Sequence, residues 1–161
     1  MEDRETSEFS MNYLPDRVSG FYGDALATYR QGLLRAFAAM SRLTIHAVSD
    51  DMGENAKLKL YDQVEEIAGL AGIDDQAYRT MRNILFENNP KDIPTELDRE
   101  IAAVMLETIK EILYQSYIRR NVLRKKLRMR RFFATQSEQE ADKLAEDSKV
   151  LPLNRPAGND W

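Results

Sequence analysis

The chain has 161 residues, of which 43% are hydrophobic and 31% charged, and its formal net charge is −4. This length suits about one domain, and the apolar content is sufficient for a folded core, which fully disordered chains lack. Seven glycines and five prolines make up roughly 7% of the chain, against about 12% in an average protein. That scarcity argues against turn-rich sandwiches, barrels, collagen-like repeats and glycine-lined nucleotide loops.

Cysteine is absent and histidine occurs once, at His46. The first fact excludes disulfides, thiolate metal sites and cysteine nucleophiles, and it suits a reducing compartment. The second excludes every site that needs two imidazoles, so we expect no metal and no cofactor. The longest apolar run, 101–106, is far shorter than the roughly 20 residues of a membrane helix, and the acidic first five residues do not resemble a secretory signal. The composition predicts a soluble, cytoplasmic, helical protein.

Helical periodicity dominates the chain. The prolines lie at 15, 90, 94, 152 and 156, so the stretches 16–89 and 95–151 are free of the strongest helix breaker. Within them apolar residues recur every three or four positions, and no segment alternates with a period of two. The sequence therefore predicts an all-α fold, a five-helix bundle without strands.

Four of the predicted helices precede residue 88. Their apolar stripes run from Val18 to Tyr29, from Leu34 to Met52, from Leu60 to Ala71 and from Tyr78 to Leu85. Pro15 stands near the first turn of the first helix, Gly53 ends the second, and Asp74 or Asp75 can cap the fourth.

The last predicted helix is unusually long. Residues 88–94 form a loop, Thr95 offers a cap, and helical spacing continues to Arg131, a span of 37 residues or roughly 55 Å. We expect one end of this helix to overhang the bundle unless it kinks. The predicted organisation is a flexible tail over 1–12, a bundle over 13–118, a basic helical extension over 119–133, and an acidic, mostly disordered tail over 134–161 with at most a short helix.

Basic residues are concentrated in this last helix. The segment 119–131 has a charge of +8 and contains no acid, so the other 148 residues sum to −12. Its members are Arg119, Arg120, Arg124, Lys125, Lys126, Arg128, Arg130 and Arg131. Three interpretations stay open: cations that offset the dipole at a helix C-terminus, solvate an overhanging helix and are neutralised by the acidic tail; a protein or self-association surface; and a site for nucleic acid or membrane. Apolar residues between the cations favour a seam against another helix.

Five further residues are candidates for a cleft: Arg42, His46, Arg82, Asn88 and Asn89. Arg42 and His46 are four residues apart and share a helix face. Arg42 can hold an anion or a loop carbonyl, or pair with an acid. His46 can transfer protons or be an ordinary, partly buried histidine, and the two asparagines can form a polar turn or contact a ligand.

The order of these segments is familiar. It rests on Leu14-Pro15, Val18, Phe21-Tyr22 and Asp24-Ala25, then on the runs 36–43 (AFAAMSRL), 60–68 (LYDQVEEIA) and 81–85 (MRNIL), which precedes an asparagine-containing loop. Over about residues 13–118 the chain resembles the bacterial family of domains of unknown function numbered 4145, which is allied to the HEPN helical superfamily.

The resemblance implies a helical bundle that often forms homodimers and occurs alone or fused to defence proteins. Active HEPN ribonucleases use an Arg and a His with four to six residues between them, whose groups polarise phosphate and move protons. Arg82 precedes the matching loop, but Glu87, Asn88 and Asn89 stand where the His would fall. We therefore expect no catalytic residues and no ribonuclease activity.

The prediction from sequence is a non-catalytic interaction or accessory module of a bacterial cytoplasm, homodimeric and bound to a protein partner that the sequence does not identify. The alternative is a nucleic-acid-binding protein, a degenerate HEPN-type ribonuclease that grips RNA or DNA through residues 119–131.

Overall fold

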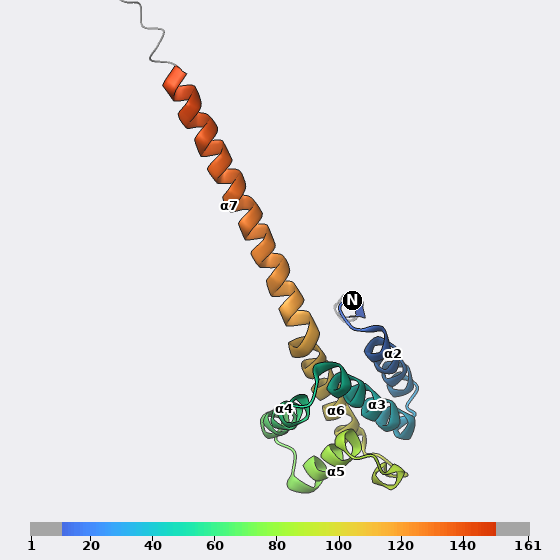
Figure 1. The fold of residues 1–161 in the computed structure, drawn as a ribbon. Coiled ribbons are helices and arrows are strands. Elements are labelled where there is room, and N and C mark those ends of the chain that lie inside the picture. The colour runs from blue at the N-terminus through green and yellow to red at the C-terminus, as the bar shows by residue number, and fades with distance from the viewer. Residues whose placement is uncertain (1–10, 151–161) are drawn as a thin grey trace, which may run out of the picture. The chain divides into compact units, whose positions relative to one another are not determined.

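The computed structural model of the protein describes residues 11–150, and side chains through residue 147 (Figure 1). Within this range every regular element is helical and no strand is present. The elements are α2 (Asp16–Arg30), α3 (Leu34–Met52), α4 (Ala56–Ala71), α5 (Asp75–Phe86), η1 (Pro90–Asp92), α6 (Arg99–Leu113), η2 (Tyr114–Ile118) and α7 (Arg119–Val150). The predicted all-α class and the long C-terminal helix are confirmed.

The chain divides into two compact units, one ending at Arg119 and one beginning at Arg120. In the first unit α3 is the central helix, because it packs against α2, α4, α5 and α6. Its inward face carries Phe37, Ile45 and Val48, all fully buried. Each such side chain contributes about 1.5–3 kcal/mol when removed from water, so this face holds the first unit together.

Local sequence signals set several helix ends as predicted. Asp74 caps α5, its Oδ1 accepting from the Ala77 amide at 2.7 Å. Gly53 follows α3 with a φ of 94°, a backbone conformation that other residues adopt only with strain. The predicted stripes of the first four helices supply most of the buried core.

The start of α6 differs from the prediction that Thr95 is its cap. The helix begins at Arg99, and the Oδ1 of Asp98 accepts from the Glu100 amide at 2.9 Å. Leu97 and Ala102, on either side of this cap, are both buried. Apolar residues at these two positions fix the angle at which the chain enters a helix, so burial of Leu97 selects Asp98 over Thr95.

A π-helical turn, η2, separates α6 from α7. Two neighbouring helices contact it. The Tyr117 hydroxyl donates to the Asp51 carboxylate of α3 at 2.8 Å, and the side-chain Nε2 of Gln63 in α4 donates to the side-chain Oε1 of Gln115 at 2.6 Å. Ile118, its last residue, is buried. The long predicted helix is therefore two α-helices joined by a wider π-helical turn with an i→i+5 hydrogen bond.

The predicted tails also differ from the structure. Residues 134–150, predicted to be mostly disordered, continue α7 without interruption, because the segment is rich in Ala, Glu, Gln and Lys and contains no glycine or proline before Pro152. At the other end, the predicted flexible tail of 1–12 includes Met11, whose side chain is partly buried against the core. Residues 1–10 and 151–161 lie outside the described range.

Candidate interaction surface

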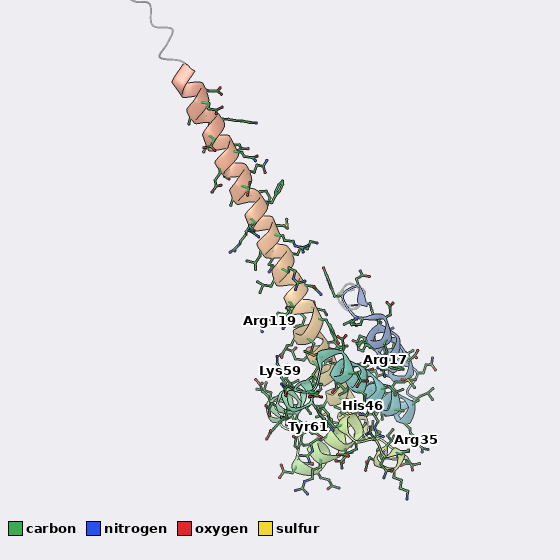
Figure 2. All side chains as sticks on the ribbon, in the orientation of Figure 1. Arg17, Arg35, His46, Lys59, Tyr61 and Arg119 are labelled. Carbon is green, nitrogen blue, oxygen red and sulfur yellow. The ribbon has the colours of Figure 1, made fainter. Side chains whose placement is uncertain are left out.

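The basic segment, residues 119–131, forms the N-terminal part of α7. All eight of its arginines and lysines are exposed, and Figure 2 shows side chains projecting from α7 along its length. These cations lie in the half of the helix that carries the positive end of the helix dipole. The interpretation that they offset a C-terminal dipole is wrong, because α7 continues 19 residues past Arg131 to Val150.

Repulsion within the basic segment is built into its spacing. Arg120, Arg124 and Arg128 follow one another at intervals of four residues, the separation at which side chains are neighbours on a helix surface. Like charges at this spacing destabilise a helix by roughly 0.2–0.5 kcal/mol per pair. Among the described residues, ion pairs join Arg17 to Asp50 and Lys110 to Glu107, and none involves the basic segment.

An acidic segment, residues 138–147, lies further along the same helix. It contains five carboxylates and one lysine, a net charge of −4. Glu138, its first acid, is seven residues beyond Arg131, or about 10 Å along the axis of a helix. The acidic segment therefore cannot neutralise the basic segment while both belong to one continuous helix.

Apolar side chains are also exposed along α7. Leu123, Leu127 and Leu144 are 54%, 54% and 70% exposed, and Ala134 and Ala141 are exposed between them. These five residues recur at intervals of 4, 7, 7 and 3, which keeps them on one side of a helix in the pattern of a coiled-coil seam. We call them the apolar seam. Arg130 and Ser137 occupy the two intervening seam positions.

Arg42, in contrast, is buried inside the first unit. Its Nε donates to the Ile84 carbonyl at 2.6 Å, one terminal nitrogen to the Asn89 carbonyl at 2.8 Å, and the other to the Asn83 carbonyl at 3.2 Å. Two of these carbonyls belong to the last turn of α5, where backbone acceptors lack the full set of partners within the helix; the Asn83 carbonyl also accepts from the Glu87 amide at 3.1 Å. Of the alternatives open from sequence, the structure gives Arg42 backbone carbonyls rather than an anion or an acid.

His46 lies one turn along α3 from Arg42 and faces the same end of α5. A backbone hydrogen bond with Phe86 favours its protonated form, yet burial, followed by the charge of Arg42, lowers its pKa from the ordinary value of 6.5. The imidazole is therefore neutral at pH 7. Arg42 and His46 are brought together by α3, and together they cap the C-terminus of α5.

Arg82 lies apart from this pair, on the exposed side of α5. Its guanidinium carbon is 5.9 Å from the centre of the Tyr61 ring, and Lys57 Nζ is at the same distance from that ring. Tyr61 in turn stacks on Phe86, with ring centres 4.0 Å apart. The sequence reasoning missed Lys57 and Tyr61; the one signal available was their i, i+4 spacing on α4.

Of the two asparagines, Asn89 has a structural role. Its side chain caps η1 by accepting from the Lys91 amide at 3.0 Å, and its own carbonyl accepts from Arg42. Asn88 is exposed. The predicted cleft set therefore separates into a capping group of Arg42, His46 and Asn89, a surface arginine in Arg82, and an exposed Asn88.

The described residues also form an open groove outside this capping group. This groove, of about 890 Å³, runs between the start of α3 and the loop before α6, lined by apolar residues that include Leu33, Ile93 and Leu97 together with Arg35 and Arg99. Residues 11–150 contain no cluster of three or more side chains of the types that bind metals. No helix in that range is both long and apolar enough to cross a membrane.

Comparison with known proteins finds no matching family, no similar curated protein and no matching solved structure.

Proposed function

We propose that the chain is a non-catalytic interaction module that binds other macromolecules, including a second copy of itself, through α7. The observation that carries the proposal is the exposure of the apolar seam beside eight cations that have no ion-pair partner among the described residues. Most helices in proteins are stabilised by packing of one face rather than by propensity, and the repulsion within the basic segment increases that need. A partner that covers the seam and supplies negative charge meets both needs.

The HEPN-like resemblance and a bacterial cytoplasmic setting belong to this proposal as well. In that view the first unit is the HEPN-like bundle. The non-catalytic part is supported by the state of the one Arg–His pair close in sequence. Arg42, 7% exposed, donates three hydrogen bonds to backbone carbonyls, so its guanidinium is committed to the end of α5. If RNA is cleaved by the purified protein, and if Arg82→Ala or His46→Ala abolishes that cleavage, this part of the proposal is wrong.

Self-association tests the proposal directly. Sedimentation velocity over a range of concentrations is compared for the native chain and for a variant carrying Leu123→Ser, Leu127→Ser and Leu144→Ser. We expect the variant to raise the dimer dissociation constant about a thousandfold or more, since each of the three leucines buried in an interface contributes about 1.5–3 kcal/mol and every 1.4 kcal/mol is tenfold. The matched control replaces Leu58 and Leu70 of α4, which are 72% and 83% exposed, and should leave association unchanged.

Nucleic acid is a second candidate partner, and a specific observation favours it. Thirteen consecutive residues offer eight exposed cations and no acid, and each phosphate contact releases counterions, so that binding falls steeply with salt. Fluorescence anisotropy with a labelled RNA at 50 and 200 mM salt measures this. Loss of binding on replacing Arg124, Lys125, Arg128 and Arg131 with Ala would support this candidate, whereas binding that ignores both salt and these substitutions would exclude it.

A further inference from the structure

The orientation of a self-associated α7 pair follows from its charge distribution, which deepens the proposed function and rests on it. The basic segment occupies one part of the helix and the acidic segment, residues 138–147, the other. A parallel pair in register would place the +8 segment of one copy beside the +8 segment of the other. An antiparallel pair places each basic segment beside the partner's acidic segment, where the charges are +8 and −4. Opposite charges in facing positions select partner orientation in helical pairs.

We propose that two copies of the chain associate through an antiparallel pair of α7 helices. In such a pair Leu127 of the apolar seam packs against the partner's Leu144, and Ala134 packs near the partner's Ser137. The two-fold axis then passes close to residues 135 and 136. The same alignment is isologous, so each contact occurs twice, as closed two-fold symmetry requires.

This alignment gives counter-charges to cations that have none within their own helix. Lys126 and Arg131, which flank the seam, come beside the partner's Asp147 and the partner's Glu138. Arg130, which interrupts the seam, comes level with the partner's Ala141 and within one turn of the partner's Glu138 or the partner's Glu140. A polar residue at a seam position lowers stability and favours an alignment that gives it a counter-charge.

The seam is of the right kind for a reversible dimer. Its large apolar members lie toward the two ends, at Leu123, Leu127 and Leu144, and the positions nearest the two-fold axis, Ala134 and Ser137, are small. Small residues allow two helices to approach closely near the two-fold axis. Because charges at the surface of such a pair are partly screened by salt, we expect the dimer dissociation constant to rise severalfold between 50 and 500 mM salt.

The absence of cysteine from the chain allows a clean test by spin labelling of single engineered cysteines in the full chain. The variants are Arg124→Cys, which flanks the seam about twelve residues from the two-fold axis, and Phe133→Cys, which flanks it close to the axis. In the antiparallel pair the two labels at residue 124 are about 35 Å apart along the helix axis, at 1.5 Å per residue. The labels at residue 133 are separated by about 10 Å between the helices and by about 8 Å along the axis.

Pulsed dipolar spectroscopy and line broadening then separate three outcomes. A distance near 35 Å at residue 124 together with strong broadening at residue 133 is the result we expect. Strong broadening at both positions indicates a parallel pair; it overturns the antiparallel arrangement and leaves the proposed function standing. No dipolar interaction at either position at concentrations up to a few hundred micromolar, or one seen only after RNA is added, overturns self-association itself.

Discussion

Arg42 of α3 and the arginines of α7 show two opposite uses of the same side chain. Arg42 is buried, and three of its N–H groups are committed to carbonyls from one helix end and the loop after it. The arginines and lysines of the basic segment are exposed, and the described residues give them no ion-pair partner. An arginine whose N–H groups are hydrogen-bonded to backbone carbonyls stabilises the fold. A row of exposed cations without ion-pair partners among the described residues is available to bind another molecule.

The largest effect that sharpens this comparison is expected from Arg42→Met. It removes three charge-assisted hydrogen bonds; the Ile84 carbonyl loses its side-chain donor, while the Asn83 carbonyl keeps the Glu87 amide, so we expect the free energy of unfolding to fall by about 3 kcal/mol. Urea denaturation followed by circular dichroism measures it. Arg124→Met in the basic segment is the matched control and should change stability by less than about 0.5 kcal/mol. Equal losses of unfolding free energy in the two variants would contradict the distinction between the buried Arg42 and the exposed arginines of α7.

A smaller loss is expected from Tyr117→Phe. The hydroxyl of Tyr117 donates to Asp51 across α3 and η2, and burial together with that carboxylate raises the pKa of the phenol. A hydrogen bond to a charged acceptor contributes about 1.5–3 kcal/mol when buried, and this one is solvent-exposed, so we expect a loss of about 1 kcal/mol. Thermal unfolding measures it. Tyr114→Phe, at an exposed position one turn earlier in η2, should be near neutral by comparison.

A pH-dependent effect is expected from His46. Because its pKa in the folded protein lies below the ordinary value of 6.5, the unfolded chain binds more protons at mildly acidic pH, and stability rises with pH through that window. The contribution is fully present above about pH 6.5 and is lost as the pH falls through the folded-state pKa. Melting temperatures between pH 5 and pH 7.5 measure the slope. In His46→Gln the slope should be shallower, and an unchanged slope would assign it to other groups.

The smallest effect is expected from Arg82→Ala. Its guanidinium carbon lies 5.9 Å from the Tyr61 ring centre, near the outer limit of a cation–π contact, which contributes roughly 0.5–1 kcal/mol at exposed sites. We expect a loss of about 0.5 kcal/mol in the same urea experiment. A loss as large as that of Arg42→Met would mean that Arg82 belongs with the buried, structural cations instead of the surface ones.

Periodicity in the sequence was enough to predict the helical class, because the stripes of α2 to α5 are long and regular. It was also enough for the ends that use a local signal, such as the Asp74 cap and Gly53. The start of α6 could not be predicted from local chemistry alone, since Thr95 and Asp98 are both good caps. Burial of Leu97 against the rest of the core decides between them.

The site was predicted less completely for two physical reasons. Polarity and acidity beyond Phe133 favour disorder in composition-based reasoning, yet the same residues have high helix propensity and extend α7 to Val150. The partners of Arg42 are backbone carbonyls 41 to 47 residues away in the chain. Because every residue has a backbone carbonyl, the sequence does not indicate which ones accept from Arg42. The packing of α3 on α5 determines them.

The most direct test of the central claim, that the charges of α7 recognise another macromolecule, is native mass spectrometry of two charge-altered variants. One carries Arg124→Glu, Lys125→Glu, Arg128→Glu and Arg131→Glu. The other carries Glu138→Lys, Glu140→Lys, Glu146→Lys and Asp147→Lys. Each variant alone has lost the attraction between a basic and an acidic segment, whereas the mixture restores it.

We predict that the native chain gives a homodimer, that each variant alone gives a monomer, and that an equimolar mixture of the two gives a one-to-one heterodimer. Homodimers of both variants at the native level, with no preference for the heterodimer on mixing, would contradict the account.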